Sequence, residues 1–243
     1  MGLAKEAGQV ADGDGVGENQ HLRLEQAADL TDLVWERVKP AIREGMSELQ
    51  LDLELSQLIR GTQGLPSFES LVQFGPDSAL PHLPPGGRRL GAGDVALLDF
   101  GVAFGGYRAD ITRVAVRGRP SSRLRQVHDA VLRAKEAAAG RLGPGITTGE
   151  VDRAARQVLE EAGLASAFTH RLGHGLGLEI HEAPSLEPGG RLVLEPGMVV
   201  TVEPGCYFPG WGGVRIEDDY LITESGARAL TTSEGGLTEL GDG

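Results

Sequence analysis

GDVALLDFG, residues 93–101, and GMVVTVEPG, residues 197–205, are two versions of one pattern separated by 104 positions. Their alignment superposes Asp99 on Glu203, and each of these acids follows a run of mostly apolar residues. An ionised carboxylate in a buried strand costs several kcal/mol unless a cation or hydrogen bonds compensate it. We therefore interpret both acids as candidates for one compensated, buried site.

A second internal match lies upstream of the first. Residues 45–51, GMSELQL, align with residues 145–151, GITTGEV, and both contain the Ser/Thr-x-x-Gln/Glu capping box that begins a helix. The two matches indicate two related halves, about 19–118 and 119–235, each built from helices followed by strands. The predicted fold class is α+β, with two pseudo-symmetric halves in a single domain, residues 19–235.

Hydrophobic periodicity predicts the elements of each half. The first helix spans about 19–43, and Pro40 kinks or separates its last turn. Further helices are predicted at about 47–61, 122–139 and 148–162, and strands at about 70–74, 94–104, 109–116, 177–181, 192–194, 198–204 and 213–222. Residues 1–18 are predicted to be a flexible leader, and residues 236–243 a C-terminal tail.

The composition is that of a globular protein with a marked negative charge. Of the 243 residues, 40% are hydrophobic and 24% are charged, which is ordinary for a domain with a real core. The net charge of −12 argues against non-specific binding to nucleic acid or to an anionic membrane. Cys206 is the single cysteine, and no apolar run approaches the roughly 18 residues of a membrane span. Since no signal peptide is visible either, we expect a cytoplasmic protein.

The first pair of acids lies on either side of a predicted turn. Asp99 and Asp110 are separated by FGVAFGGYRA, in which Gly105-Gly106 is typical of a hairpin turn. A hairpin would place both carboxylates on neighbouring strands, close enough to share an ion. The structural alternative is that Asp99 caps a turn and Asp110 pairs with Arg108 or Arg113.

The second pair repeats this arrangement. Glu203 and Glu217 flank a loop that contains Pro209-Gly210-Trp211-Gly212-Gly213. Here the alternative is that Arg215 is a simple salt-bridge partner. The recurrence of both pairs favours the shared site.

Histidines are concentrated in THRLGHGLGLEIHEAP, residues 169–184. His170, His174 and His181 all lie in this segment, among glycines that allow close approach of backbone or ligand. A Gly-rich phosphate loop is the competing interpretation. The segment lacks the Lys-Ser/Thr of a P-loop and does not match GxGxxG, so a metal or catalytic role is favoured. The sequence predicts one metal cluster made of Asp99, Asp110, His174, Glu203 and Glu217.

These motifs resemble the pita-bread metallopeptidase family, which includes methionine aminopeptidases, aminopeptidase P and prolidases. The resemblance covers about residues 20–230. It rests on ALPH (79–82), LLDFG (97–101), YRADITR (107–113), HRLGHGLGLEIHEAP (170–184), VVTVEPG (199–205) and GGVRIEDDYLIT (212–223). Every position that corresponds to a metal ligand of the family is occupied. The resemblance implies the pita-bread fold, in which two pseudo-symmetric halves enclose a dinuclear metal site.

The resemblance also implies the role of each ligand. Asp99 and Glu217 would bridge two divalent metal ions, Asp110 would bind one ion, and His174 and Glu203 would bind the other. Oxygen-dominated ligation favours Mn²⁺, while the imidazole also permits Co²⁺, Zn²⁺ or Fe²⁺. A water between the ions would lose a proton near neutral pH and give the hydroxide that attacks the peptide bond.

Catalytic and substrate-binding residues follow from the same resemblance. Glu203 would carry the proton from the attacking water to the departing nitrogen, and His181 would stabilise the developing oxyanion. His82 would contact the scissile region. His170 and Arg215 would line the pocket for proline.

Two features favour the proline-specific branch of the family. His170 lies four residues before His174, and Arg215-Ile216-Glu217-Asp218 matches the segment around the last ligand. Methionine aminopeptidases typically differ at both places. Asp77 stands where the proline-specific members usually carry Asn. About 20 residues precede the expected catalytic domain, where aminopeptidase P and prolidase carry an additional N-terminal domain. We therefore expect Xaa-Pro-Yaa peptides to be accepted at least as well as Xaa-Pro dipeptides.

The predicted activity is hydrolysis of N-terminal Xaa-Pro bonds in short peptides. Three alternatives are left open: a methionine aminopeptidase-type activity, a non-catalytic binding scaffold on the same fold, and a metal-free hydrolase like creatinase. The complete set of ligand positions, together with His82 and His181, weighs against the last two. Nucleic acid and membranes are not expected partners, and a homodimer is left open.

Overall fold

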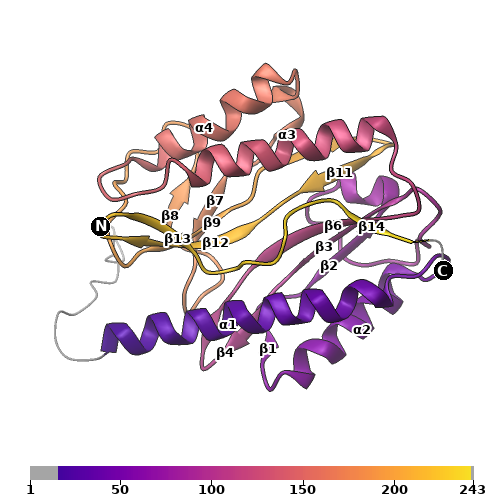
Figure 1. Cartoon of the computed structure of the whole chain (residues 1–243), viewed down its shortest axis with the longest axis horizontal. Helices are drawn as coiled ribbons and strands as arrows, with labels where there is room; N and C mark the ends of the chain where they lie inside the picture. The colour runs from indigo at the N-terminus through magenta and orange to yellow at the C-terminus, as the bar shows by residue number, and fades with distance from the viewer. Residues whose placement is uncertain (1–15, 242–243) are drawn as a thin grey trace, which may run out of the picture.

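The structure is a computed structural model, and it describes residues 16–241. These residues form four α-helices: α1 (Val16–Val38), α2 (Glu48–Gly61), α3 (Ser122–Ala139) and α4 (Thr148–Glu161). Three short 3-10 helices are η1 (Lys39–Ala41), η2 (Gly75–Ala79) and η3 (Ala165–Ala167). In Figure 1, α1 and α2 lie on one side of the strands and α3 and α4 lie on the other.

The first half contains a four-stranded sheet in the order β14-β6-β3-β2. Its strands are β2 (Leu71–Phe74), β3 (Val95–Phe100), β6 (Ile111–Arg117) and, from the end of the chain, β14 (Thr238–Leu240). Between β3 and β6, β4 (Val102–Phe104) and β5 (Tyr107–Arg108) form a hairpin, and β1 (Leu65–Pro66) pairs with β4. The turn residues Gly105 and Gly106 have φ values of 59° and 91°, which glycine adopts without strain. The predicted hairpin is therefore confirmed.

The second half contains a five-stranded sheet in the order β13-β12-β9-β7-β8. Its strands are β7 (Gly173–Gly175), β8 (Glu182–Leu186), β9 (Val199–Val202), β12 (Asp218–Thr223) and β13 (Gly226–Ala229). A separate hairpin of β10 (Gly205–Phe208) and β11 (Gly212–Arg215) links β9 to β12.

The apolar run in β3 is continuous because both of its faces are covered. Ala96, Leu98 and Phe100 belong to the core under α1 and α2, whereas Val95 and Leu97 belong to the larger core that includes α3 and α4. Side chains alternate along a strand. Asp99 therefore follows Val95 and Leu97 on the face that is turned toward the second half.

The predicted repeat recurs in the backbone hydrogen bonds. The N–H of Gly45 donates to the carbonyl of Leu90 at 2.8 Å, and the N–H of Gly145 donates to the carbonyl of Leu194 at 2.9 Å. In both halves this bond precedes a helix, α2 or α4, that begins with a complete capping box. The two halves therefore share local structure as well as sequence pattern.

The two sheets meet at Thr112 and Glu217. These residues form an isolated antiparallel bridge, in which the N–H of Glu217 donates to the carbonyl of Thr112 at 3.2 Å. Thr112 lies opposite Asp99, and Asp218 lies opposite Val202. The residue equivalent to Glu217 in the first half is therefore Thr112, and Asp110 lies two residues earlier, so the two pairs of acids are not in equivalent registers.

A buried ion pair lies beside this bridge. Arg113 and Asp218, which hold equivalent positions in the two halves, form an ion pair with an N–O distance of 2.5 Å, and their side chains are 1% and 5% exposed. Lys135 of α3 also contacts Asp218. Arg113 comes from the first half and Asp218 from the second, so their ion pair joins the two halves.

The predicted helices agree with the structure, and one predicted strand is wrong. α1 ends at Val38 and η1 follows, which confirms the separated last turn at Pro40. Residues 177–181 form a loop, because the strand lies earlier, at β7. A Cβ at Gly173 would lie 2.0 Å from the carbonyl oxygen of Thr201, so this strand is glycine-rich and carries no apolar alternation. The predicted strand at 192–194 is reduced to a single bridge at Val193.

The ends of the chain depart from the predicted boundaries. Residues 1–15, most of the predicted leader, lie outside the described residues. At the other end, β14 pairs in parallel with β6, so part of the predicted tail belongs to the first-half sheet. None of the helices within residues 16–241 combines the length and the apolar character that crossing a membrane requires.

Candidate metal centre

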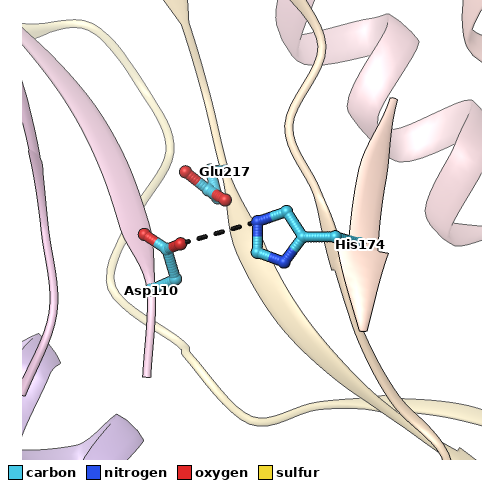
Figure 2. A group of neighbouring side chains, drawn as sticks. All are labelled: Asp110, His174 and Glu217. Atoms are coloured by element: carbon cyan, nitrogen blue, oxygen red, sulfur yellow. Dashed lines mark ion pairs between the residues drawn. The ribbon is translucent and has the colours of Figure 1, made fainter. Parts of the chain in front are cut away.

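Asp110, His174 and Glu217 each offer one ligand atom, and these atoms all lie within 4.8 Å of one another. Asp110 directly precedes β6, His174 is the middle residue of β7, and Glu217 lies between β11 and β12, so both halves supply ligands. Figure 2 shows the three side chains directed toward a common space. They are 5%, 2% and 1% exposed, respectively.

The imidazole of His174 is oriented for ligation through Nε2. Its Nδ1 lies 3.1 Å from the carbonyl of Gly175, which can only accept, so Nδ1 carries the hydrogen. Nε2 then lies 3.8 Å from Asp110 Oδ2 and 3.7 Å from Glu203 Oε1. Burial lowers the pKa of His174 to about 4, so the ring is neutral and its free lone pair points at the acids.

The glycines on either side of His174 allow strand β7 to pack closely between β8 and β9. A Cβ on Gly175 would lie 2.2 Å from the carbonyl oxygen of Ala183 in β8, and Gly173 is equally confined against Thr201 in β9. The hydroxyl of Thr201 also accepts the backbone N–H of His174 at 3.1 Å. The Gly-His-Gly pattern therefore fixes the ligand through close backbone packing.

Two carboxylate oxygens of this cluster, Asp110 Oδ1 and Glu217 Oε1, have no hydrogen-bond partner among the described residues. Burial, followed by repulsion from neighbouring carboxylates, raises the pKa of both groups well above ordinary values. A cation between them would satisfy both oxygens and offset the repulsion. Carboxylate oxygens with one imidazole nitrogen suit a divalent transition metal, so the residues fit the expected metal.

Glu203 and Asp99 border the three-residue cluster. Burial raises the pKa of Glu203 to about 8, although the nearby Arg215 opposes the shift. Asp99 Oδ2 accepts a hydrogen bond of 2.5 Å from Arg215 Nη2. The charges of Glu203 and Asp99 both raise the pKa of Glu217, so all five predicted ligands lie in one electrostatic cluster.

Arg215 is buried, at 2% exposure, and its donors are occupied. It donates to Asp99, to the hydroxyl of Tyr207 at 2.8 Å and to the hydroxyl of Thr112 at 3.0 Å. This geometry favours the salt-bridge interpretation of Arg215 over an open proline-pocket position. Arg215 is linked to His170 through the hydroxyl of Tyr207.

His170 lies at the end of this hydrogen-bonded chain. Its Nδ1 donates to the carbonyl of Arg171 at 2.6 Å, which leaves Nε2 to accept from the Tyr207 hydroxyl at 2.9 Å. Burial, followed by the charge of Arg215, lowers the pKa of His170 to about 4. The ring is therefore neutral, and both of its nitrogens are bonded to protein.

His181 and His82 are exposed, in contrast to His170. The His181 ring packs edge-on against His174, with ring centroids 4.4 Å apart. Burial lowers the pKa of His181, the charges of Arg171 and His82 add to the shift, and Asp99 opposes it. The ring contact places His181 beside the cluster, and the charge of His82 lowers the pKa of both His181 and His170.

Several residues of this site were not singled out from the sequence. Tyr207 and Thr112 join the ligands to Arg215, and Asp219 Oδ2 accepts the backbone N–H of Asp110 at 2.9 Å. Arg108, which the sequence suggested only as a partner for Asp110, instead contacts the loop that carries His181, because its Nε donates to the Leu178 carbonyl at 2.9 Å. The third acid in Glu-Asp-Asp was the available signal for Asp219. The others depend on strand register and side-chain reach, which the sequence does not display.

Residues 23–224 match the model of metallopeptidase family M24. The chain is 43% identical over 218 residues to the putative dipeptidase YkvY of Bacillus subtilis, covering 88% of this chain and 59% of that protein. It is 39% identical over 213 residues to the Xaa-Pro dipeptidase of Pyrococcus furiosus, covering 87% of this chain and 61% of that protein.

Among solved structures, the fold is similar to an Xaa-Pro dipeptidase from Bacillus anthracis, with a TM-score of 0.89 and 41% sequence identity. That alignment covers 92% of this chain and 63% of the other. The chain therefore spans about three fifths of the length of these relatives.

Proposed function

The chain belongs to metallopeptidase family M24, and on that basis we propose that it is a metal-dependent exopeptidase that hydrolyses N-terminal Xaa-Pro bonds. The observation that carries the proposal is the convergence of Asp110, His174 and Glu217, with two buried carboxylate oxygens that lack a partner. Relatives named as Xaa-Pro dipeptidases support the choice of substrate. The substrates are short peptides with proline at the second position.

The proposed cofactor is a pair of divalent cations, with Mn²⁺ preferred and Co²⁺, Zn²⁺ or Fe²⁺ as alternatives. Asp99, Asp110, His174, Glu203 and Glu217 would hold them. When bound, such cations polarise the scissile carbonyl and lower the pKa of a water molecule toward about 7.

The side chains of the protein have complementary roles in this proposal. Glu203 accepts the proton of the attacking water and delivers it to the departing proline nitrogen. His181, which is exposed beside His174, donates a hydrogen bond to the carbonyl oxygen as negative charge develops there. His82 contacts the scissile region. Both exposed imidazoles are free to reach substrate, whereas the ligands beneath them are buried.

The proline ring would pack against His170. Because both nitrogens of this imidazole are bonded to protein, the ring presents an oriented surface with no free hydrogen-bonding atom. Such a surface suits the pyrrolidine ring of proline, which has no N–H to satisfy once it is acylated. Arg215 supports this surface through Tyr207 and does not itself contact substrate.

A peptide panel tests this function. The metal-stripped chain would be assayed with Mn²⁺, Co²⁺ or Zn²⁺ on Xaa-Pro dipeptides, Xaa-Pro-Yaa tripeptides and Met-Ala-Ser. We expect metal-dependent cleavage of the proline peptides and little release of Met. Efficient release of Met with the proline peptides untouched would assign the chain to the methionine aminopeptidase branch. Absence of cleavage with bound metal would indicate a binding scaffold.

A further inference from the structure

Arg156 reaches from α4 to the segment that carries His170. Its Nη2 donates to the carbonyl of His170 at 2.7 Å, and its Nη1 donates to the carbonyl of Phe168 at 3.3 Å. The guanidinium carbon also lies 4.2 Å from the centroid of the Phe168 ring. Three contacts therefore attach residues 168–170 to α4.

Asp152, one turn earlier on α4, orients the guanidinium. Its Oδ2 accepts from Arg156 Nε at 2.8 Å, and its side chain is 2% exposed, compared with 29% for Arg156. The planar fork of an arginine allows Nε to bind the acid while both terminal nitrogens bind carbonyls. A lysine at position 156 has a single nitrogen and lacks this geometry.

The attached segment leads from the substrate side to the metal centre. The Phe168 ring packs edge-on against the His170 ring, with centroids 5.1 Å apart. Strand β7, which contains His174, begins three residues after His170. His170 is therefore held from two directions, with Arg156 at its backbone and Tyr207 at its ring.

We propose that the Asp152–Arg156 pair positions His170 against the proline of the substrate, and that Arg156 does so without contacting substrate. This inference rests on the proposed function, because that function assigns His170 to the proline pocket. The Asp152–Arg156 pair holds the backbone of His170, whereas Arg215 and Tyr207 hold the His170 ring. Displacement of His170 weakens the binding of proline more than it slows the bond-breaking step.

The first test compares Arg156→Met with Arg153→Met. Arg153 is exposed on the same helix and lines the same surface groove of about 600 Å³, so its replacement removes the same charge without touching residues 168–170. We expect Arg156→Met to raise KM for an Xaa-Pro peptide about 10-fold, with a smaller fall in kcat and unchanged metal content. Arg153→Met should resemble the wild type. Equal effects of the two substitutions would overturn the proposal.

A double-mutant cycle with His170→Ala tests whether Arg156 acts through His170. If it does, Arg156→Met should add little to the KM of His170→Ala. If the KM increases of the two single substitutions multiply in the double variant, the proposal is overturned. Arg156→Lys keeps a positive charge beside Asp152 and serves if the methionine variant does not fold. It should show the same KM effect in weaker form, and a wild-type KM would again contradict the assignment.

Amide hydrogen exchange provides a readout that does not depend on activity. In Arg156→Met, residues 168–174 should exchange faster than in Arg153→Met, while β9 should stay unchanged. Equal exchange of residues 168–174 in the two variants would overturn the proposed positioning even if the wild type cleaves proline peptides. Faster exchange in a protein that cleaves none would retain the attachment and reject the proposed function and its assignment of His170.

Discussion

The hydroxyl of Thr112 donates a 2.7 Å hydrogen bond to the carboxylate of Glu217, across the bridge that joins the two sheets. The same oxygen accepts a hydrogen bond of 3.0 Å from Arg215 Nε. One hydroxyl therefore orients a candidate metal ligand and the arginine that holds Asp99. Because Thr112 is fully buried, water cannot replace it.

Replacing Thr112 by valine should reduce activity without unfolding the protein. The side chain keeps its shape but leaves Arg215 Nε and one Glu217 oxygen without their partner. We expect a loss of kcat/KM of about 10–100-fold, as for partners of metal ligands, and a loss of unfolding free energy of about 1–3 kcal/mol. Thr112→Ser keeps the hydroxyl and should retain most of the activity. Equal activity of the valine and serine variants would show that the hydroxyl has no such role.

Glu217→Gln should lower the metal content per chain and remove measurable turnover. Glutamine keeps the size of the side chain but loses the charge that a shared ligand must supply, so the cost should exceed the roughly 10–100-fold typical of outer partners. Metal analysis and peptide assays would measure both effects. Glu195→Gln, at an exposed glutamate, is the matched control. A Glu217→Gln protein with wild-type metal content would refute the ligand assignment.

The two neighbouring imidazoles should respond differently to alanine substitution. His181→Ala should keep its metal while kcat falls by about two orders of magnitude or more, because its role is confined to the transition state. His174→Ala should lose metal, because it removes the Nε2 that faces Asp110 and Glu203. Metal analysis of both variants separates the roles. Loss of metal from His181→Ala alone would reverse the assignment.

The stabilising effect of metal should increase with pH. Burial raises the pKa of Glu203 in the folded, metal-free protein from 4.5 to about 8. A raised pKa means that this group favours the folded state below pH 4.5 and that the contribution is lost as pH rises toward about 8. Bound metal compensates the negative charge that Glu203 then carries beside the other carboxylates. The difference in Tm between metal-loaded and stripped protein should therefore grow from pH 5 to pH 8, and a difference independent of pH would contradict the prediction.

Asp110 and Glu217, which the structure brings beside His174, could be grouped from the sequence because their spacing is carried by strands and turns. Asp99 and Asp110 flank a Gly-Gly turn, and Glu203 follows an apolar strand, so local patterns were sufficient to group them. The role of Arg215 was not accessible. Its partners Tyr207 and Thr112 come together only through the register of β10 with β11 and the contact between the two sheets.

The strand that carries His174 was misplaced for a related reason. β7 is Gly-His-Gly and lacks the alternating apolar residues that predict a strand, whereas the loop after it contains Leu178 and Ile180 and imitates one. Close backbone packing at Gly173 and Gly175 replaces side-chain packing there. Strand prediction from alternating hydrophobic side chains cannot detect β7, because this strand contains none of them.

Arg113 and Asp218 make the two halves selective for each other. In a homodimer of two identical first halves, each residue near the dyad would face its own copy. Arg113 would then meet a second Arg113 in a buried seam, without the carboxylate of Asp218 that the second half supplies. Like charges repel strongly where water is excluded. Residues 16–118 should therefore associate with residues 119–241 in preference to another copy of themselves. In this way a buried charge selects the partner of the first half within a single polypeptide.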